Sequence, residues 1–365
     1  MRIVYDSFEG RYSDNPRALY EWLRPRVPGE HIWMSDPRHQ ASFPRNTVTV
    51  PHGSAEAVAA LESADLVVAN THIDFEWDKR PETTYLQTWH GTPLKRIHHD
   101  VVYAPPGRLP RLDRDVARWD YLLSPNAEST PRLRAAFNFP GEILEYGYPR
   151  NDVLLSPHAD AVRARVRASL GLDEGDTAVL YTPTWRDHAY YDPTRPPVQL
   201  ALDVAEFSAR LGPRVKLLPR LHYLITDRGL PVDDPGVVDV SYYPDVAELY
   251  LAADAMVTDY SSTMFDFAVT GKPLLFYTYD LDEYRAHERG FYYDLEPIAP
   301  GPVISDPHAL VGALQDLPGV QRAYAARYRR FQQTFCALED GRATKRTGRF
   351  LRQQVLRVNA PLAPA

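Results

Sequence analysis

The chain is nearly devoid of cysteine and has no long apolar segment. Its single thiol, Cys336, excludes an intrachain disulfide framework and a cysteine-based zinc site, and it suits a reducing compartment. No window approaches the roughly 18 consecutive apolar residues of a membrane-spanning helix. The amino-terminal MRIVYDSFEGRY lacks the apolar core of a secretory signal, and the 12 histidines form no HExxH pattern. We therefore expect a cytoplasmic protein with no cofactor and no metal.

Net positive charge is also absent. The formal net charge of −7 at pH 7 argues against a nucleic-acid partner. Only five of the 41 basic residues are lysine, so arginine dominates. Arginine suits bidentate phosphate binding, but coding bias in a GC-rich genome is the simpler explanation of the skew.

Length and patterning indicate two α/β halves. The 365 residues exceed a typical domain of roughly 150 residues. Short apolar runs alternate with helical patterns, which is typical of βαβ units and parallel sheets, and turn-forming residues interrupt the alternation at 148–152. Strands are predicted at Ile3–Tyr5, His31–Met34, Val48–Val50, Leu66–Ala69, Tyr85–Thr88, Tyr121–Leu123, Ile143–Glu145, Ala178–Tyr181, Val215–Leu218, Val237–Val240, Ala255–Thr258 and Leu274–Tyr277. The tail from 307 to 356 is predicted to be mostly helical.

The segment 255–268 carries the strongest chemical signal. A buried strand ends at Thr258, and a helix is expected to begin within 261–263, with Asp259 and Ser261 as N-cap residue types. Amide groups and the hydroxyls of Ser261 and Ser262 at such a helix start suit a phosphate. The competing interpretation is an ordinary capped helix.

Two other strand ends contribute polar side chains. One strand runs into Thr184 and Arg186, and another runs into Arg220 and His222. Because carboxyl ends of parallel strands share one edge of a sheet, these side chains and the helix start at 261–262 are expected to converge as a diphosphate site. Each taken alone is more typical of a surface or capping residue.

In the first half, a strand ends at Thr88 and is followed by Trp89-His90-Gly91-Thr92-Pro93. The Gly91-Thr92 turn frees the backbone, and His90 at the strand end is a natural general base for a hydroxyl. A structural histidine bonded to a neighbouring loop is the alternative.

These segments resemble the CDP-glycerol glycerophosphotransferase family of teichoic-acid synthesis. The similarity is carried, in order along the chain, by TWHGTPLK at 88–95, YTPTWR at 181–186, PRLH at 219–222, TDYSSTMFDFAVTGKP at 258–273, RGFYYD at 289–294 and DGRAT at 340–344. The resemblance implies a GT-B-like architecture of two Rossmann-type, doubly wound parallel-sheet domains facing across a cleft. The expected domains are an acceptor-side domain at 1–150, a CDP-donor domain at 151–335, and a carboxyl-terminal helix within 336–365 that packs back towards the first domain.

The resemblance also implies residue roles. His90 is expected to be the catalytic base, and His222 to assist at the transferring phosphate. Donor contacts are expected from Ser261 and Ser262, with Asp266 nearby; the full expected donor set is Thr184, Arg186, Arg220, Thr258, Asp259, Ser261, Ser262 and Asp266. Gly91 and Thr92 form the acceptor-side turn.

The expected reaction is attack of an acceptor hydroxyl on the β-phosphorus of CDP-glycerol or another CDP-polyol, with release of CMP. The acceptor is a lipid-linked or polymeric one in cell-wall or capsule synthesis. Two alternative functions stay open: a glycosyltransferase that uses a nucleotide sugar, and a non-catalytic binding module. The identity of the polyol, the choice between single addition and polymerisation, and the oligomeric state also stay open. Peripheral contact with the inner face of the membrane through the arginine-bearing tail also stays open. Two Asp-x-Asp pairs, at 113–115 and 280–282, are potential metal ligands, although helix capping is the better interpretation of the second.

Overall fold

The computed structural model describes residues 1–101, 107–184, 201–202, 204–222, 234–287 and 290–358. The chain divides into two compact units. Unit 1 comprises residues 1–90, 104–152 and 338–365, and unit 2 comprises residues 91–103 and 153–337. The chain therefore enters each unit more than once.

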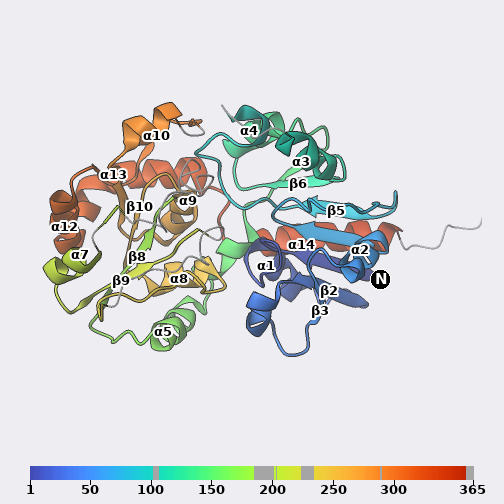
Figure 1. Ribbon diagram of the computed structural model, residues 1–365, viewed down its shortest axis with the longest axis horizontal. Helices are drawn as coiled ribbons and strands as arrows, with labels where there is room; N and C mark the ends of the chain where they lie inside the picture. The colour runs from blue at the N-terminus through green and yellow to red at the C-terminus, as the bar shows by residue number, and fades with distance from the viewer. Residues whose placement is uncertain (102–106, 185–200, 203, 223–233, 288–289, 359–365) are drawn as a thin grey trace, which may run out of the picture. The chain divides into compact units, whose positions relative to one another are not determined.

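The described part of unit 1 is built on a seven-stranded parallel sheet (Figure 1). The spatial order of its strands is β3-β2-β1-β4-β5-β6-β7, an order typical of doubly wound α/β folds. The order reverses between β1 and β4, where Tyr5 is in register with Val68. The strands are β1 (Arg2–Asp6), β2 (Glu30–Ser35), β3 (Val48–Pro51), β4 (Leu66–Ala69), β5 (Thr84–Gln87), β6 (Tyr121–Ser124) and β7 (Glu142–Glu145).

Helices of unit 1 come from both ends of the sequence. They are α1 (Asp14–Leu23), α2 (Ala55–Glu62), α3 (Arg108–Val116), α4 (Ser129–Ala136) and α14 (Ala343–Val358), with a short 3₁₀ turn at η1 (Pro37–Ser42). The 3₁₀ segment η3 (Pro149–Leu155) includes residues of both units. The helix α14, red in Figure 1, packs on α1 although more than 300 residues separate them. Leu351 and Val355 on α14 join Leu19 and Leu23 of α1 in one buried cluster. This contact fixes the carboxyl-terminal helix to unit 1.

The described part of unit 2 contains a five-stranded parallel sheet in the order β12-β11-β10-β8-β9. This is the second common doubly wound order, and it reverses between β8 and β10. Val257 of β10 is in register with Tyr181 of β8. The strands are β8 (Thr177–Thr182), β9 (Val215–Pro219), β10 (Ala255–Thr258), β11 (Leu274–Tyr277) and β12 (Val303–Ile304).

Both faces of the unit 2 sheet are buried. Met256 and Phe276 point into one cluster, while their neighbours Val257 and Leu275 point into another, as strand alternation requires. Strands buried on both faces explain the continuous apolar runs in the sequence. The helices are α5 (Ala159–Ser169), α7 (Val204–Leu211), α8 (Val246–Ala252), α9 (Thr263–Phe267), α10 (Leu281–His287), α11 (Leu295–Ile298), α12 (Pro307–Gln315) and α13 (Leu317–Phe335), with 3₁₀ turns η2 (His98–Asp100) and η5 (Ala268–Thr270).

The predicted α/β class with parallel sheets is confirmed in both units. The strand predicted at Val237–Val240 is wrong, because only Val237 forms a bridge there, to Leu217. The two-residue strand β12 escaped prediction because so short a run has no periodicity. Within the described residues, no helix combines the length and apolarity needed to cross a membrane.

Candidate active site

Three threonines bind one another where the strand order of unit 2 reverses. The Thr182 hydroxyl at the end of β8 donates to the Thr258 hydroxyl at the end of β10 across 3.0 Å. Thr258 in turn donates to the Thr182 carbonyl at 2.9 Å, and the hydroxyls of Thr182 and Thr263 lie 3.0 Å apart. The predicted donor residue Thr258 therefore stands at the switch point, where ligands of doubly wound sheets bind.

Asp259 joins the two loops that leave these strands. Its Oδ1 accepts from the backbone N–H of Thr184 at 2.8 Å and from that of Tyr260 at 2.6 Å. The carboxylate is only 3% exposed. Asp259 therefore shapes the loops, because its Oδ1 is turned towards backbone amides rather than outward.

The turn after Asp259 offers backbone donors. The N–H of Thr263 and that of Phe265 bond back to Ser261 Oγ and the Ser262 carbonyl, at 3.3 and 3.1 Å. Within the described residues, the N–H groups of Ser261 and Ser262 and the Ser262 hydroxyl have no hydrogen-bond partner. The helix α9 that follows has five residues, so these local donors, more than a long helix dipole, suit an anion. Asp266 is buried on α9, one turn further on.

Gly91 lies against this turn within unit 2. A Cβ on Gly91 would stand 2.6 Å from Ser262 Oγ and 3.0 Å from Ser262 Cβ, so a side chain fits there only if Ser262 or the backbone moves. Thr92 beside it is buried. Gly91 and Ser262, which are 171 positions apart in the sequence, therefore meet in one place.

The segment that carries Gly91 is anchored to the rest of unit 2 by backbone pairing. Lys95 forms an antiparallel bridge with Phe291. The Arg96 N–H donates to the Gly290 carbonyl at 3.0 Å, and the Tyr292 N–H donates to the Leu94 carbonyl at 2.8 Å. Residues 290–292 of the predicted motif thus hold the segment that carries the turn at 91–92.

Arg220 and His222 follow β9. Arg220 Nη1 donates to the carbonyls of Val240 and Tyr243, at 3.0 and 2.7 Å. The Leu221 N–H donates to the Ser241 hydroxyl at 2.9 Å, which fixes the loop that carries half-buried His222. Arg186 lies outside the described residues.

His90 lies in unit 1, beside the switch point of that sheet. Its Nδ1 is 2.6 Å from the carbonyl oxygen of Asn70, which directly follows β4. A carbonyl only accepts, so Nδ1 carries the hydrogen and Nε2 of the neutral ring keeps its lone pair. The indole of Trp89 packs on the imidazole with ring centroids 4.1 Å apart. This arrangement prepares Nε2 to accept a proton.

Backbone contacts hold His90 and its neighbour. Trp89 adopts a left-handed φ of 53°, a conformation that costs about 1–3 kcal/mol for a non-glycine residue. Asn15 Nδ2 donates to the Trp89 carbonyl at 3.2 Å, and Arg150 Nη1 donates to the His90 carbonyl at 3.0 Å. Arg150 Nη1 also pairs with Asp14 Oδ2 at 2.5 Å, with both side chains almost fully buried.

The supporting residues Asp14, Asn15 and Arg150 were missed from the sequence, where 148–152 was interpreted only as a break. A signal was present, because Arg150 follows the predicted strand at 143–145 and so belongs to the carboxyl edge of the sheet.

Neither Asp-x-Asp pair presents two available carboxylates. Asp115 Oδ2 accepts from the Ile73 N–H, the Tyr85 hydroxyl and Trp119 Nε1, at 3.1, 3.2 and 2.9 Å. Burial raises the pKa of Asp115 to about 7. Asp280 Oδ1 accepts from the Tyr260 hydroxyl at 2.9 Å and precedes α10. Asp115 and Asp280 therefore support local structure.

Comparison with known proteins shows to which family this chain is similar. A family model described as CDP-glycerol:poly(glycerophosphate) glycerophosphotransferase matches residues 1–353. The teichoic acid poly(glycerol phosphate) polymerase of Staphylococcus epidermidis is 36% identical over 364 residues, which cover 97% of this chain and 50% of that protein. The chain thus spans about half the length of that relative. The teichoic acid glycerol-phosphate transferase of Staphylococcus aureus is 38% identical over 354 residues, which cover 94% of this chain and 91% of that protein.

Solved structures show the same relationship as the sequence comparisons. The wall teichoic acid polymerase TagF matches with a TM-score of 0.87 and 35% identity, over 98% of this chain and 89% of that chain. A UDP-GlcNAc 2-epimerase from Neisseria meningitidis matches with a TM-score of 0.54 at 11% identity, which shows a common fold alone. The family model, the identities and the arrangement of the motifs lead to one conclusion: the chain belongs to the CDP-glycerol:poly(glycerophosphate) glycerophosphotransferase family.

Proposed function

We propose that this chain transfers glycerol phosphate from CDP-glycerol to a hydroxyl of a wall or capsule polymer and releases CMP. One observation carries the proposal most directly: Gly91 packs against Ser262, which joins the histidine–glycine motif to the turn with unsatisfied donors. Relatives named as glycerol-phosphate transferases and polymerases support the choice of donor.

Unit 2 is proposed to bind the donor. The N–H groups of Ser261 and Ser262 would bind the diphosphate at the switch point marked by Thr182 and Thr258. Oriented backbone donors of this kind contribute roughly 2.7–4 kcal/mol each to transition-state stabilisation in well-studied enzymes. The Arg220 guanidinium, held by two carbonyls, adds positive charge at the end of β9.

His90 is proposed to be the general base. Its Nε2 accepts the proton of the acceptor hydroxyl as that oxygen forms a bond to the β-phosphorus. The bond from the β-phosphorus to the bridging oxygen of CMP breaks, and CMP leaves with the electron pair. His222 donates a hydrogen bond to a phosphoryl oxygen, and the proton on His90 returns to solvent. No step uses a metal.

The proposal includes a GT-B-like arrangement of the two units, with unit 1 serving the acceptor and unit 2 the donor. It also includes a cytoplasmic location with peripheral contact at the inner face of the membrane, where a lipid-linked acceptor is presented. The arrangement of the units follows from the family resemblance, the location from the single cysteine, and the membrane contact from the arginine-bearing tail.

Product analysis tests the reaction class. The chain is incubated with a short glycerol-phosphate acceptor and CDP-glycerol, CDP-ribitol or UDP-linked sugars, with and without EDTA. We expect CMP from CDP-glycerol at an unchanged rate in EDTA. Release of a nucleoside diphosphate from a sugar donor would instead identify a glycosyltransferase, and loss of activity in EDTA would refute the metal-free step.

His90→Ala tests the base. General-base catalysis contributes on the order of 10²–10⁴-fold, so turnover should fall by at least about a hundredfold while the unfolding midpoint stays near that of the unaltered chain. His158→Ala is the matched control, since His158 is exposed and its side chain forms no helix cap. Near-normal turnover of His90→Ala would remove this histidine from the mechanism.

A further inference from the structure

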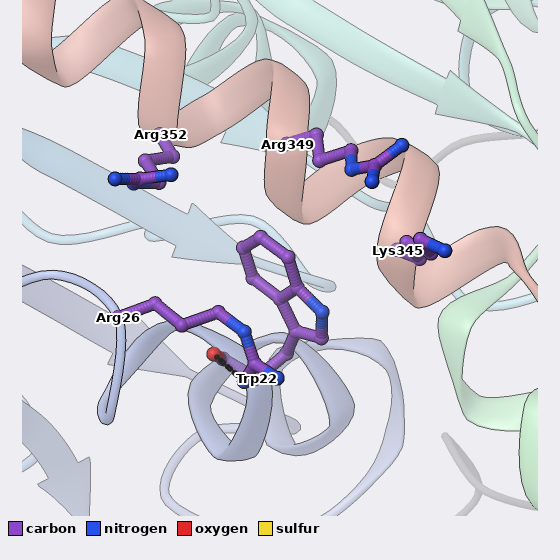
Figure 2. Close-up of a pocket in the computed structure, with 5 residues that line it drawn as sticks. All are labelled: Trp22, Arg26, Lys345, Arg349 and Arg352. Atoms are coloured by element: carbon purple, nitrogen blue, oxygen red, sulfur yellow. Dashed lines mark hydrogen bonds between the residues drawn. The ribbon is translucent and has the colours of Figure 1, made fainter.

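Unit 1 has a basic surface pocket of about 570 Å³ that none of the site residues above touches. Its lining is Trp22 and Arg26 from α1 and the region after it, with Lys345, Arg349 and Arg352 from α14. Figure 2 shows the indole of Trp22 rising between the two helices, with the three cations of α14 spread along one side of it. The lining contains four cations and no carboxylate.

The cations of α14 are arranged in a row. Lys345, Arg349 and Arg352 follow one another at spacings of four and three residues, which places them on one helix face. With a rise of about 1.5 Å per residue, the row extends for about 10 Å. Lys345, Arg349 and Arg352 are exposed, whereas Leu351 and Val355 lie on another face of α14 and are buried. The row therefore faces away from the core.

These three cations are not used by the fold. Within the described residues, Lys345, Arg349 and Arg352 form no ion pair and no side-chain hydrogen bond. Arg346 on the same helix differs, because it pairs with Asp340 at 2.7 Å and donates to the Tyr146 carbonyl. Like charges one turn apart disfavour a helix, and the whole chain has a net charge of −7. Such a row suits an anionic ligand that neutralises it.

Trp22 lines the pocket and lies against Gly348 of α14. A Cβ on Gly348 would stand 2.4 Å from Trp22 Cε3, so only glycine lets the indole lie against α14. Arg26 stacks on the indole with its guanidinium carbon 4.7 Å from the ring centroid, and its Nη1 donates to the Trp22 carbonyl at 2.8 Å. This cation–π contact orients Arg26 beside the row on α14.

We propose that this pocket binds the phosphodiester backbone of a poly(glycerol phosphate) chain, as a site separate from the one that performs transfer. The proposal rests on the proposed function for the identity of the polymer. A flexible chain with one negative charge per repeat matches a concave row of cations, whereas a bilayer surface would require apolar side chains directed outward. The only aromatic residue of the lining is instead packed against Gly348.

Binding is measured without donor, by calorimetry, with poly(glycerol phosphate) of about ten units and with a single-unit acceptor. We expect Arg349→Ala/Arg352→Ala to weaken binding of the long chain by at least about tenfold. The slope of log affinity against log salt should fall by about one to two. CMP release with the single-unit acceptor should stay unchanged. The matched control is Arg329→Ala/Arg330→Ala, which removes two exposed arginines of α13 outside the pocket and should leave long-chain binding unchanged.

Equal affinities of the two double variants for the long chain would overturn the proposal. A second arm uses phosphatidylglycerol vesicles: if the pocket variant loses vesicle binding and keeps polymer binding, the surface is a membrane contact and the proposal is wrong. The experiment separates failure of this proposal from failure of the proposed function. If the chain bound the polymer through the pocket but released no CMP, the binding site would be confirmed and only the proposed transferase activity would be refuted.

Discussion

Replacing Gly91 by alanine tests the contact with Ser262 on which the proposed donor site depends. The added Cβ would lie 2.6 Å from Ser262 Oγ, and ordinary contact begins beyond 3.4 Å, so one of the two backbones or the serine must move by about 0.8 Å. Overpacking of this kind costs about 1–3 kcal/mol of unfolding free energy. A displacement near 1 Å at a reacting centre costs on the order of 10²-fold in rate. We expect Gly91→Ala to show both losses.

A double-mutant cycle with Ser262 separates strain from chemistry. Ser262→Gly removes both atoms that the new Cβ would meet, so Gly91→Ala/Ser262→Gly should recover stability relative to the sum of the single changes, with a coupling of about 0.5–3 kcal/mol. Activity should stay low in the double variant, because the Ser262 hydroxyl is lost. Urea unfolding and CMP release measure the two effects.

Gly312→Ala is the control for the cycle. Gly312 lies within α12, and a Cβ there meets no atom within 4 Å, so this change should be neutral or stabilising by up to about 1 kcal/mol. If Gly91→Ala matched Gly312→Ala in stability and turnover, or if Ser262→Gly relieved nothing, the close approach of Gly91 to Ser262 would be refuted.

Two further predictions concern unit 1. Arg150→Met leaves Asp14 buried without its partner and should lower the unfolding free energy by about 3–5 kcal/mol. The double variant Arg150→Met/Asp14→Asn should recover part of this loss. Equal stability of Arg150→Met and the unaltered chain in urea would contradict the prediction. Burial raises the pKa of Asp115 to about 7 in the native state, against about 3.9 in the unfolded chain. The native state therefore binds this proton more tightly. Its contribution to the free energy of unfolding is lost as the pH rises from about 4 to about 7. Asp115→Asn should flatten the fall of the urea midpoint across that range, and an identical pH profile would show that Asp115 does not titrate there.

The sequence predicts the strands well where they are buried on both faces. The runs at 66–69, 255–258 and 274–277 match β4, β10 and β11 residue for residue. Their continuous apolar character leaves no competing helical period. The run at 237–240 contains Asp239 and forms one bridge only, at Val237. Pairing depends on the neighbouring strand as well as on local pattern.

In the candidate site, too, the sequence predicts the positions that follow from a strand end and misses the long-range contacts. Thr258 ends β10, and Ser261 and Ser262 follow it closely, so the edge of the sheet places all three. The role of Asp259 differs from a simple helix cap, since its carboxylate accepts from the Thr184 N–H of another loop. Such a bond joins residues 75 apart in the sequence, and no local pattern reports it.

The boundary between the two units falls between two residues of the candidate site, His90 and Gly91. Unit 1 includes residues up to His90, and unit 2 begins again at Gly91. One peptide bond therefore joins the residue proposed as base to the residue packed on Ser262, and it keeps their α carbons about 3.8 Å apart. His90 is held in unit 1 through Asn70 and Arg150, while Gly91 is held in unit 2. Whatever the orientation of the two units, this peptide bond therefore keeps the backbone of the proposed base next to the residue that packs on Ser262.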